Sequence, residues 1–198
     1  MRHLILMCCV AMVLPAFAQD GPAVEPAVPS AVPAGVPAAV PAAGPVVLGT
    51  APEACADGAA GPAALVQVSG FKDRTGNLRV ELYPAVEGEF LAPGSKLRAE
   101  GKVFQRIDNP TPQEGDAWVC IALPGEGPFA IAVLHDRNAS GKLDAFNDGF
   151  GFPNNPRLGW GKPAAAEATF NAAAGVTRLD VVLNYWNGLS ARPVRRPR

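Results

Sequence analysis

The stretch LRVELY, residues 78–83, decides the fold class because apolar and polar side chains alternate along it. Leu78, Val80 and Leu82 project to one side of an extended chain, whereas the charged side chains between them project to the other. This period of two residues is typical of a β-strand with one buried face. The turn residues 73–77 precede it, so we expect a hairpin with the strand before them.

Outward from this strand, six more segments have the short length and apolar content of β-strands. They are Leu65–Phe71, Gly101–Ile107, Asp116–Leu123, Phe129–His135, Ala168–Asn171 and Val176–Trp186. Clusters of Gly, Pro and Asn separate them, and we find no convincing amphipathic helix, only a single helical turn after Pro163. The pattern predicts an all-β domain over residues 64–187, an antiparallel β-sandwich of about seven strands.

The segments on either side of this domain differ in composition. Between Gly21 and Ala64 prolines recur roughly every four residues, and each removes a backbone donor and disfavours helix before it. We therefore expect residues 19–63 to be a disordered, semi-rigid Pro/Ala-rich linker. Residues 188–198 are a basic Pro/Arg tail, which we expect to be disordered or loosely attracted to an anionic surface.

The first 18 residues have the three parts of a secretory signal peptide. Arg2 and His3 precede the apolar run Leu4–Leu14, and Ala16 and Ala18 supply the small residues before a cleavage site. The run is too short to span a bilayer, which takes roughly 20 residues. We expect cleavage near Ala18 and a periplasmic or secreted protein without a transmembrane segment.

Two cysteines follow the predicted signal peptide, Cys55 and Cys120. A pair of cysteines in an oxidising compartment predicts a disulfide, which would stabilise the domain by roughly 4 kcal/mol through loop closure. The alternative is two isolated thiols.

Charge and histidine content argue against several functions. The chain has 17 Lys and Arg against 18 Asp and Glu, with the signs interspersed, so we expect no nucleic-acid partner. His135 is the single histidine after the signal peptide, and no G-x-S-x-G motif is present. We therefore expect no enzyme; an envelope hydrolase would need a pocket where His135 meets a carboxylate and a nucleophile.

The segment HDRNASGKLD, residues 135–144, is similar to the start of a calcium-binding loop. Its candidate ligands are Asp136, Asn138, Ser140, the carbonyl of Lys142, and Asp144. The match is partial, because Asn147 stands where an EF-hand has its bidentate glutamate. The same residue types also form Asx-turns without an ion, so a calcium site and a purely structural turn both stay open.

A second loop combines glycines with aromatic and amide side chains. Phe146 and Phe150 precede its candidate binding-surface residues, which are Phe152, Asn155, Arg157 and Trp160. Exposed, they would form a recognition surface for an envelope protein, a peptide or a glycan. Alternatively the aromatic rings fold back and cap one end of the sandwich. A solvent-exposed apolar patch would favour binding.

Several motifs together resemble a bacterial exported family, domain of unknown function 2141. They are VSGFKDRTGNLRVELYP from residue 68, FAIAVLHDRNASGKLD from residue 129, GFGFPNNPRLGWGKP from residue 149 and the EATF strand from residue 167. The resemblance covers roughly Leu65 to Tyr185 and implies a prealbumin-like or immunoglobulin-like sandwich in a periplasmic or secreted protein. It implies no activity. Family members often carry Asn or Asp at the position of Ser140, which weakens the calcium interpretation.

These observations predict an exported accessory or binding module of the cell envelope, with no assigned ligand and with the calcium loop as a candidate. The alternative is a purely structural domain without a ligand.

Overall fold

The computed structural model describes residues 46–188 and 190–194. The predicted signal peptide and the predicted linker as far as residue 45 lie outside the described residues. Within these ranges the chain forms strands, one α-helix and two 3-10 helices. The strands are β1 (Val47–Leu48), β2 (Ala63–Ser69), β3 (Asn77–Pro84), β4 (Gln105–Pro110), β5 (Ala117–Ala122), β6 (Gly127–Asp136), β7 (Gly149–Gly151), β8 (Thr169–Ala172), β9 (Val176–Val182), β10 (Asn184–Asn187) and β11 (Ser190–Pro193). The helices are Pro52–Cys55 (3-10), α1 (Gly94–Ala99) and Ala165–Ala168 (3-10).

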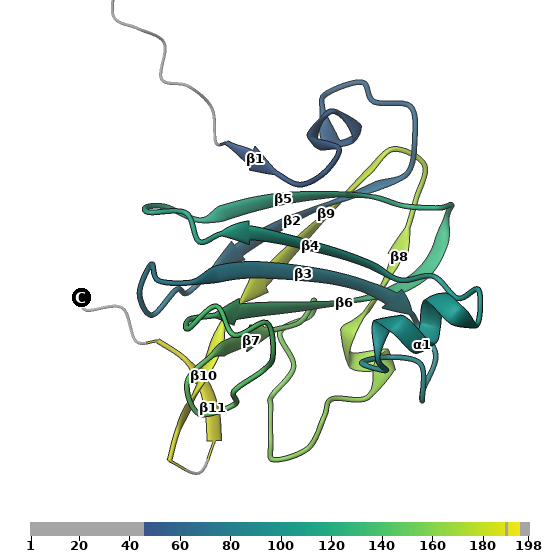
Figure 1. The fold of residues 1–198 in the computed structure, drawn as a ribbon. Helices are drawn as coiled ribbons and strands as arrows, with labels where there is room; N and C mark the ends of the chain where they lie inside the picture. The colour runs from purple at the N-terminus through teal and green to yellow at the C-terminus, as the bar shows by residue number, and fades with distance from the viewer. Residues whose placement is uncertain (1–45, 189, 195–198) are drawn as a thin grey trace, which may run out of the picture. The chain divides into compact units, whose positions relative to one another are not determined.

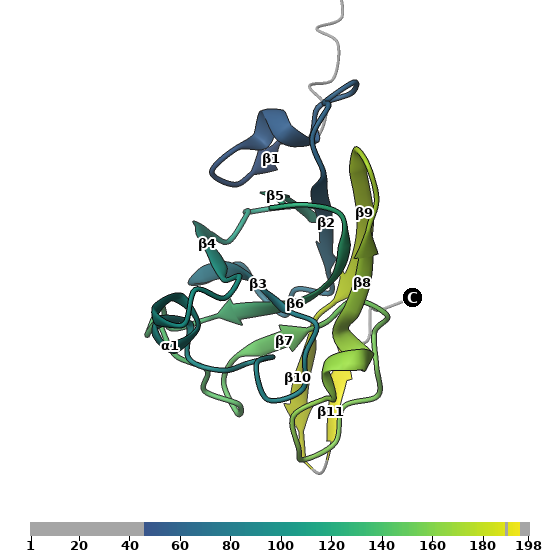
Figure 2. The ribbon, with the colours of Figure 1, turned by 90° about the vertical axis from the view of Figure 1, so that its right-hand side faces the viewer.

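The strands form two sheets, as the sequence predicts (Figures 1 and 2). The four-stranded sheet has the order β1-β5-β2-β9, and the seven-stranded sheet has the order β11-β10-β7-β6-β3-β4 with β8 paired to β6. Most pairs are antiparallel, but β2 runs parallel to β9 and β1 runs parallel to β5. The all-β sandwich is confirmed, with more strands than the seven expected because several edge strands are very short.

The alternating segment Leu78–Tyr83 lies in β3, between β4 and β6 of the seven-stranded sheet. The preceding strand, β2, lies in the four-stranded sheet, so the predicted hairpin between these two strands is wrong. Leu78, Val80 and Leu82 are at most 1% exposed and belong to the core between the two sheets. On the opposite face Arg79 pairs with Asp108 at 2.7 Å. The alternation therefore marks the buried face correctly.

The predicted single strand Val176–Trp186 is in fact two strands in different sheets. β9 belongs to the four-stranded sheet and β10 to the seven-stranded sheet, and fully buried Leu183 joins them. Both sheets face the same interior, so inward side chains continue to alternate across the change of sheet. Alternation alone could not reveal this corner.

The region Gly101–Ile107 was predicted as a strand, but β4 begins only at Gln105 and α1 precedes it. α1 has six residues and buries only Gly94 and Leu97, so it carries no amphipathic repeat that a sequence pattern could show. Leu97 packs in a second apolar cluster on the outer face of the seven-stranded sheet, away from the shared core. This second cluster supports the loops discussed below.

The predicted boundaries of the sandwich are too narrow at both ends. β1 and a 3-10 helix lie in the range expected to be linker, and Cys55 in that helix forms the predicted disulfide with Cys120 of β5. β11 lies in the range expected to be tail, where it pairs antiparallel with β10 and buries Ala191. The Pro/Arg-rich composition hides this strand, because a strand this short buries only one of its side chains. Gly188, with φ of 71°, permits the tight turn between β10 and β11. Among the described residues no helix is both long and apolar enough to cross a membrane.

Candidate functional site

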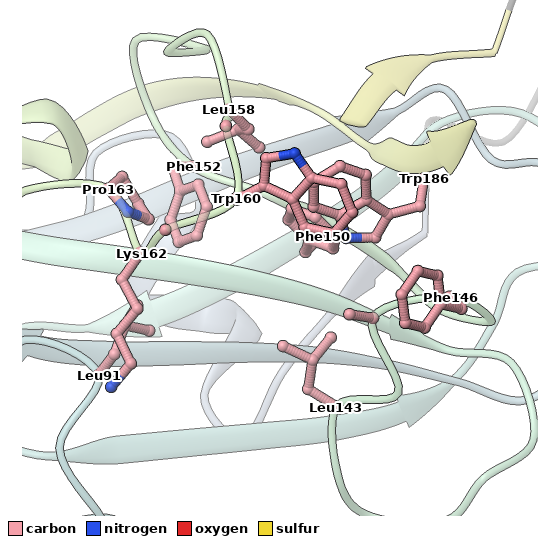
Figure 3. Close-up of a pocket in the computed structure, with 13 residues that line it drawn as sticks. Leu91, Leu143, Phe146, Phe150, Phe152, Leu158, Trp160, Lys162, Pro163 and Trp186 are labelled. Atoms are coloured by element: carbon pink, nitrogen blue, oxygen red, sulfur yellow. The ribbon is translucent and has the colours of Figure 1, made fainter. Parts of the chain in front are cut away.

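An apolar groove of about 370 Å³, which we call the aromatic groove, is lined almost entirely by apolar side chains (Figure 3). It lies over β7 and β10, between the loops that precede β7 and β8. Its main lining residues are Leu91, Leu143, Phe146, Phe150, Phe152, Leu158, Trp160, Lys162, Pro163 and Trp186. Its volume falls within the range of small-ligand and peptide sites.

The floor and the rim of the groove differ in exposure. Phe152 and Leu158 on the floor are 5% and 9% exposed, and the Phe152 ring packs edge-on against Phe90 at 5.9 Å. On the rim Trp160 is 68% exposed and Phe146 is 74% exposed. The floor therefore belongs to the second apolar cluster, whereas the rim faces solvent.

The rim contains a stacked pair of indoles. The Trp160 and Trp186 rings lie 4.6 Å apart between centroids with an interplanar angle of 33°, and Figure 3 shows Trp160 above Trp186 and Phe150. Phe146 extends the row, 6.4 Å from Trp186. Neither indole N–H has a hydrogen-bond partner among the residues that the structure describes. The groove thus offers aromatic faces together with two free donors.

Strand alternation positions these rings. In β10 Tyr185 points into the shared core while Trp186, the next residue, points outward into the groove. Glycine is required opposite Tyr185, because a Cβ on Gly149 of β7 would lie 2.4 Å from the tyrosine ring. Phe150, between two glycines of β7, then points outward beside Trp186. Two short strands therefore position Phe150 and Trp186 in the groove.

The four predicted binding-surface residues do not form one surface. Phe152 and Trp160 line the aromatic groove, whereas Asn155 and Arg157 line a separate, more polar hollow of about 540 Å³. We call it the arginine hollow; its lining residues are Asn155, Pro156, Arg157, Leu158, Val182, Asn184 and Ser190–Pro193. Asn155 there bonds the backbone of β9, accepting from the Val182 N–H at 2.7 Å and donating to the Asp180 carbonyl at 3.2 Å.

Sequence reasoning missed Trp186 and Leu143 as groove residues. Trp186 had a usable signal, since it is a large aromatic residue on the outward side of an alternating strand. Leu143 had none, because a single exposed leucine in a turn is common.

The predicted calcium ligands gather around their own backbone. The Asp136 carboxylate is 1% exposed and accepts from the backbone N–H groups of Ser140 at 3.0 Å and Gly141 at 2.7 Å. The Asn138 side-chain oxygen also accepts from the Ser140 N–H, at 3.1 Å. These hydrogen bonds are those of Asx-turns, in which Asp and Asn side chains accept from nearby backbone N–H groups.

The rest of the loop is closed in the same way. The Ser140 hydroxyl donates to the Lys142 carbonyl at 3.0 Å, and the Asp144 carboxylate accepts from the Phe146 N–H at 3.2 Å. A second buried carboxylate, Asp148, was not predicted; it accepts from the Asp144 N–H at 2.7 Å. Within the described ranges no three or more His, Cys, Asp or Glu side chains are grouped to hold a metal. Calcium binding stays a prediction.

His135 is fully buried at the base of this loop. Its Nε2 lies 2.8 Å from the Thr75 carbonyl, so we assign the proton to Nε2; Nδ1 then accepts from the Tyr185 hydroxyl at 2.7 Å. Burial lowers the pKa of His135 and raises the pKa of Tyr185 to about 12. The neutral ring thereby connects β6 to β10.

An ion pair lies beside this histidine. Although burial opposes ionisation of Asp73, hydrogen bonds from Arg137 and Thr75 hold the pKa of its carboxyl at about 2. Arg137 Nε donates to Asp73 at 2.8 Å, and its Nη1 donates to the Asn147 carbonyl at 2.7 Å. These bonds fix the loop before β7, on which Phe146 is carried.

The fold defines this chain as a two-sheet β-sandwich protein. A family model described as an uncharacterized protein conserved in bacteria, domain of unknown function 2141, matches residues 66–180. The match covers more than half of the chain, so the protein belongs to this family, and the resemblance noted from the sequence is confirmed. A search of curated proteins found no match, and neither did a search of solved structures.

Proposed function

We propose that this protein is an exported binding module of the cell envelope, and that its aromatic groove binds an extended peptide segment of a partner protein through apolar side chains. The exposed rim of the groove carries this proposal. Three large apolar side chains, Leu143, Phe146 and Trp160, are 58%, 74% and 68% exposed around one hollow. Monomeric domains rarely leave such side chains together in water unless the surface binds something.

The chemistry of the groove favours a peptide. Aromatic faces suit apolar side chains, and Trp residues are enriched where binding energy is concentrated. The free indole N–H groups of Trp160 and Trp186 can donate to the carbonyls of an extended backbone. A glycan would also stack on indoles, but it would need several polar groups, and Lys162 is the one charged side chain among the described residues of the groove.

Part of the loop before β8 has a structural role. Phe152 and Leu158 are buried in the second apolar cluster, as the capping alternative expects. Capping does not explain the rim, because Phe146 and Trp160 bury little surface. The floor therefore stabilises the fold, whereas the rim is available for binding. If the rim binds nothing, the alternative of a purely structural domain without a ligand holds.

Selection from a library of random peptides of about 12 residues tests the proposal. The library is panned against the full mature chain from Gln19, and single peptides are measured by titration calorimetry. We expect enriched peptides with large apolar residues, whose affinity falls at least about tenfold in Trp160→Ala, as for a hot-spot tryptophan. Val46→Ala, which removes an exposed apolar side chain outside the groove, is the matched control.

Two results would overturn the proposal. One is a selection that enriches no peptide above the background of an unrelated protein. The other is a set of peptides that bind Trp160→Ala as tightly as the natural chain. Export is tested separately, by expressing the gene in a bacterium and finding whether the mature protein begins at Gln19.

A further inference from the structure

The arginine hollow adjoins the aromatic groove. Leu158 lines both, so the two concave surfaces meet at this residue. The β10–β11 hairpin contributes to both surfaces, because Trp186 of β10 lines the groove and its cross-strand neighbour, Ala191 of β11, lines the hollow. The two concave surfaces can therefore be occupied by one ligand.

The charge in the hollow lacks a counter-charge. Arg157 is exposed and has no hydrogen bond or ion pair with any described residue. Arg192 donates from Nε to the Ser190 hydroxyl at 2.8 Å, and no carboxylate pairs with it in the part of the chain that the structure describes. Three other arginines of the sandwich, Arg79, Arg106 and Arg137, each pair with a carboxylate. Arg178 of β9 has no carboxylate partner among the described residues, but it lies outside both concave surfaces.

We propose that the segment bound in the aromatic groove is acidic, and that its carboxylate is held by Arg157 and Arg192 in the arginine hollow. This inference rests on the proposed function of the groove and adds the charge of the partner to it. Guanidinium groups stay protonated and present forked donors that match a carboxylate. Asn155 lines the same hollow, and its side chain bonds β9.

The carboxylate has two sources, an Asp or Glu side chain and the free C-terminus of the partner. Both present the same anion to the two guanidinium groups. Peptides from the library selection distinguish them, because each is synthesised with a free and with an amidated C-terminus. Loss of affinity on amidation identifies the terminus; loss on replacing Asp or Glu by Asn or Gln identifies the side chain.

The test measures the affinity of the selected peptides for four full-length mature proteins: the natural chain, Arg157→Ala/Arg192→Ala, Trp160→Ala and Arg178→Ala. Arg178 is an exposed arginine of β9 that lines neither concave surface, so it controls for loss of charge alone. We expect the double variant to bind about tenfold more weakly or worse. We expect Arg178→Ala to bind as the natural chain does. Binding by the natural chain should also weaken as salt rises from about 50 to about 500 mM, since surface charges are screened.

The outcomes separate the two proposals. Peptides that depend on Trp160 but contain no excess of carboxylates, and that bind the double variant as well as the natural chain, would overturn this inference and leave the groove intact. Equal loss in Arg178→Ala and in the double variant would also overturn it, because the attraction would then be non-specific. A selection without Trp160-dependent peptides overturns the proposed function instead.

Discussion

Replacing Trp160 by alanine should leave the stability of the domain almost unchanged, although it removes one of the two tryptophan side chains of the aromatic groove. Trp160 is 68% exposed, so its main stabilising contact is the stack with Trp186. Aromatic pairs contribute about 0.5–1.5 kcal/mol, and solvent exposure places this pair at the low end. In a domain of this size a loss of about 0.5 kcal/mol lowers the melting temperature by about 1–2 °C.

The matched variant is Phe152→Ala, on the floor of the same groove. Phe152 is 5% exposed and packs against Phe90, so its loss opens a cavity in the second apolar cluster and should cost about 3–5 kcal/mol. Urea unfolding followed by circular dichroism gives both free energies. If Trp160→Ala were destabilised as strongly as Phe152→Ala, the rim would be part of the structural cap, and the division between rim and floor would be refuted.

Three further predictions concern the cysteines, the buried histidine and the loop that follows it. Reducing the disulfide between Cys55 and Cys120, or replacing both cysteines by alanine, should cost roughly 4 kcal/mol, seen as a lower melting temperature with a reductant than without; equal values would contradict the loop-closure argument. Burial lowers the pKa of His135 below its unfolded value near 6.5, so below about pH 6.5 the unfolded state binds more protons than the folded state. The free energy of unfolding should therefore be highest above about pH 6.5 and fall on acidification. A free energy of unfolding that stays constant from about pH 7 to about pH 5 would exclude this effect of His135. If the Asp136–Asp144 loop binds calcium, millimolar calcium should raise the melting temperature of the natural chain but not of Asp136→Ala. That variant is itself expected to be less stable, because the Asp136 carboxylate accepts hydrogen bonds from two backbone N–H groups. An unchanged melting curve of the natural chain would mean that the loop binds no calcium.

The sequence was sufficient for the sandwich because β3 and β6 are central strands, whose buried faces impose a strict pattern. Val80 of β3 faces Val133 of β6 and Ile107 of β4, and all three are at most 3% exposed. Where the constraint was weaker, the prediction failed. α1 buries two residues, and β11 needs only Ala191 inside, so neither has a pattern that stands out from a loop.

The candidate site was predicted in part for a related reason. The glycine and aromatic content of residues 146–161 predicts either a recognition surface or a cap on the sandwich, and the groove does contain Trp160 and Phe152. Its other wall comes from Trp186, on β10, and that pairing arises only because the chain changes sheet at Leu183. The outward position of Trp186 can be predicted from strand alternation, but its long-range contact with Trp160 cannot. Arg157 and Trp160 line different concave surfaces because the side chains of successive loop residues point in different directions, and the sequence does not show these directions.

The three tryptophans give the sharpest test of peptide binding in the aromatic groove, when a selected peptide is added to the chain from Gln19 onward. Trp160 and Trp186 lie in the aromatic groove, whereas Trp118 lies on β5 of the other sheet. In nuclear magnetic resonance spectra of the ¹⁵N-labelled protein, we predict that the indole N–H signals of Trp160 and Trp186 shift with added peptide while that of Trp118 stays in place. Shifts confined to Trp118, or no shift in any of the three with a peptide bound, would contradict the claim that the aromatic groove is the binding surface.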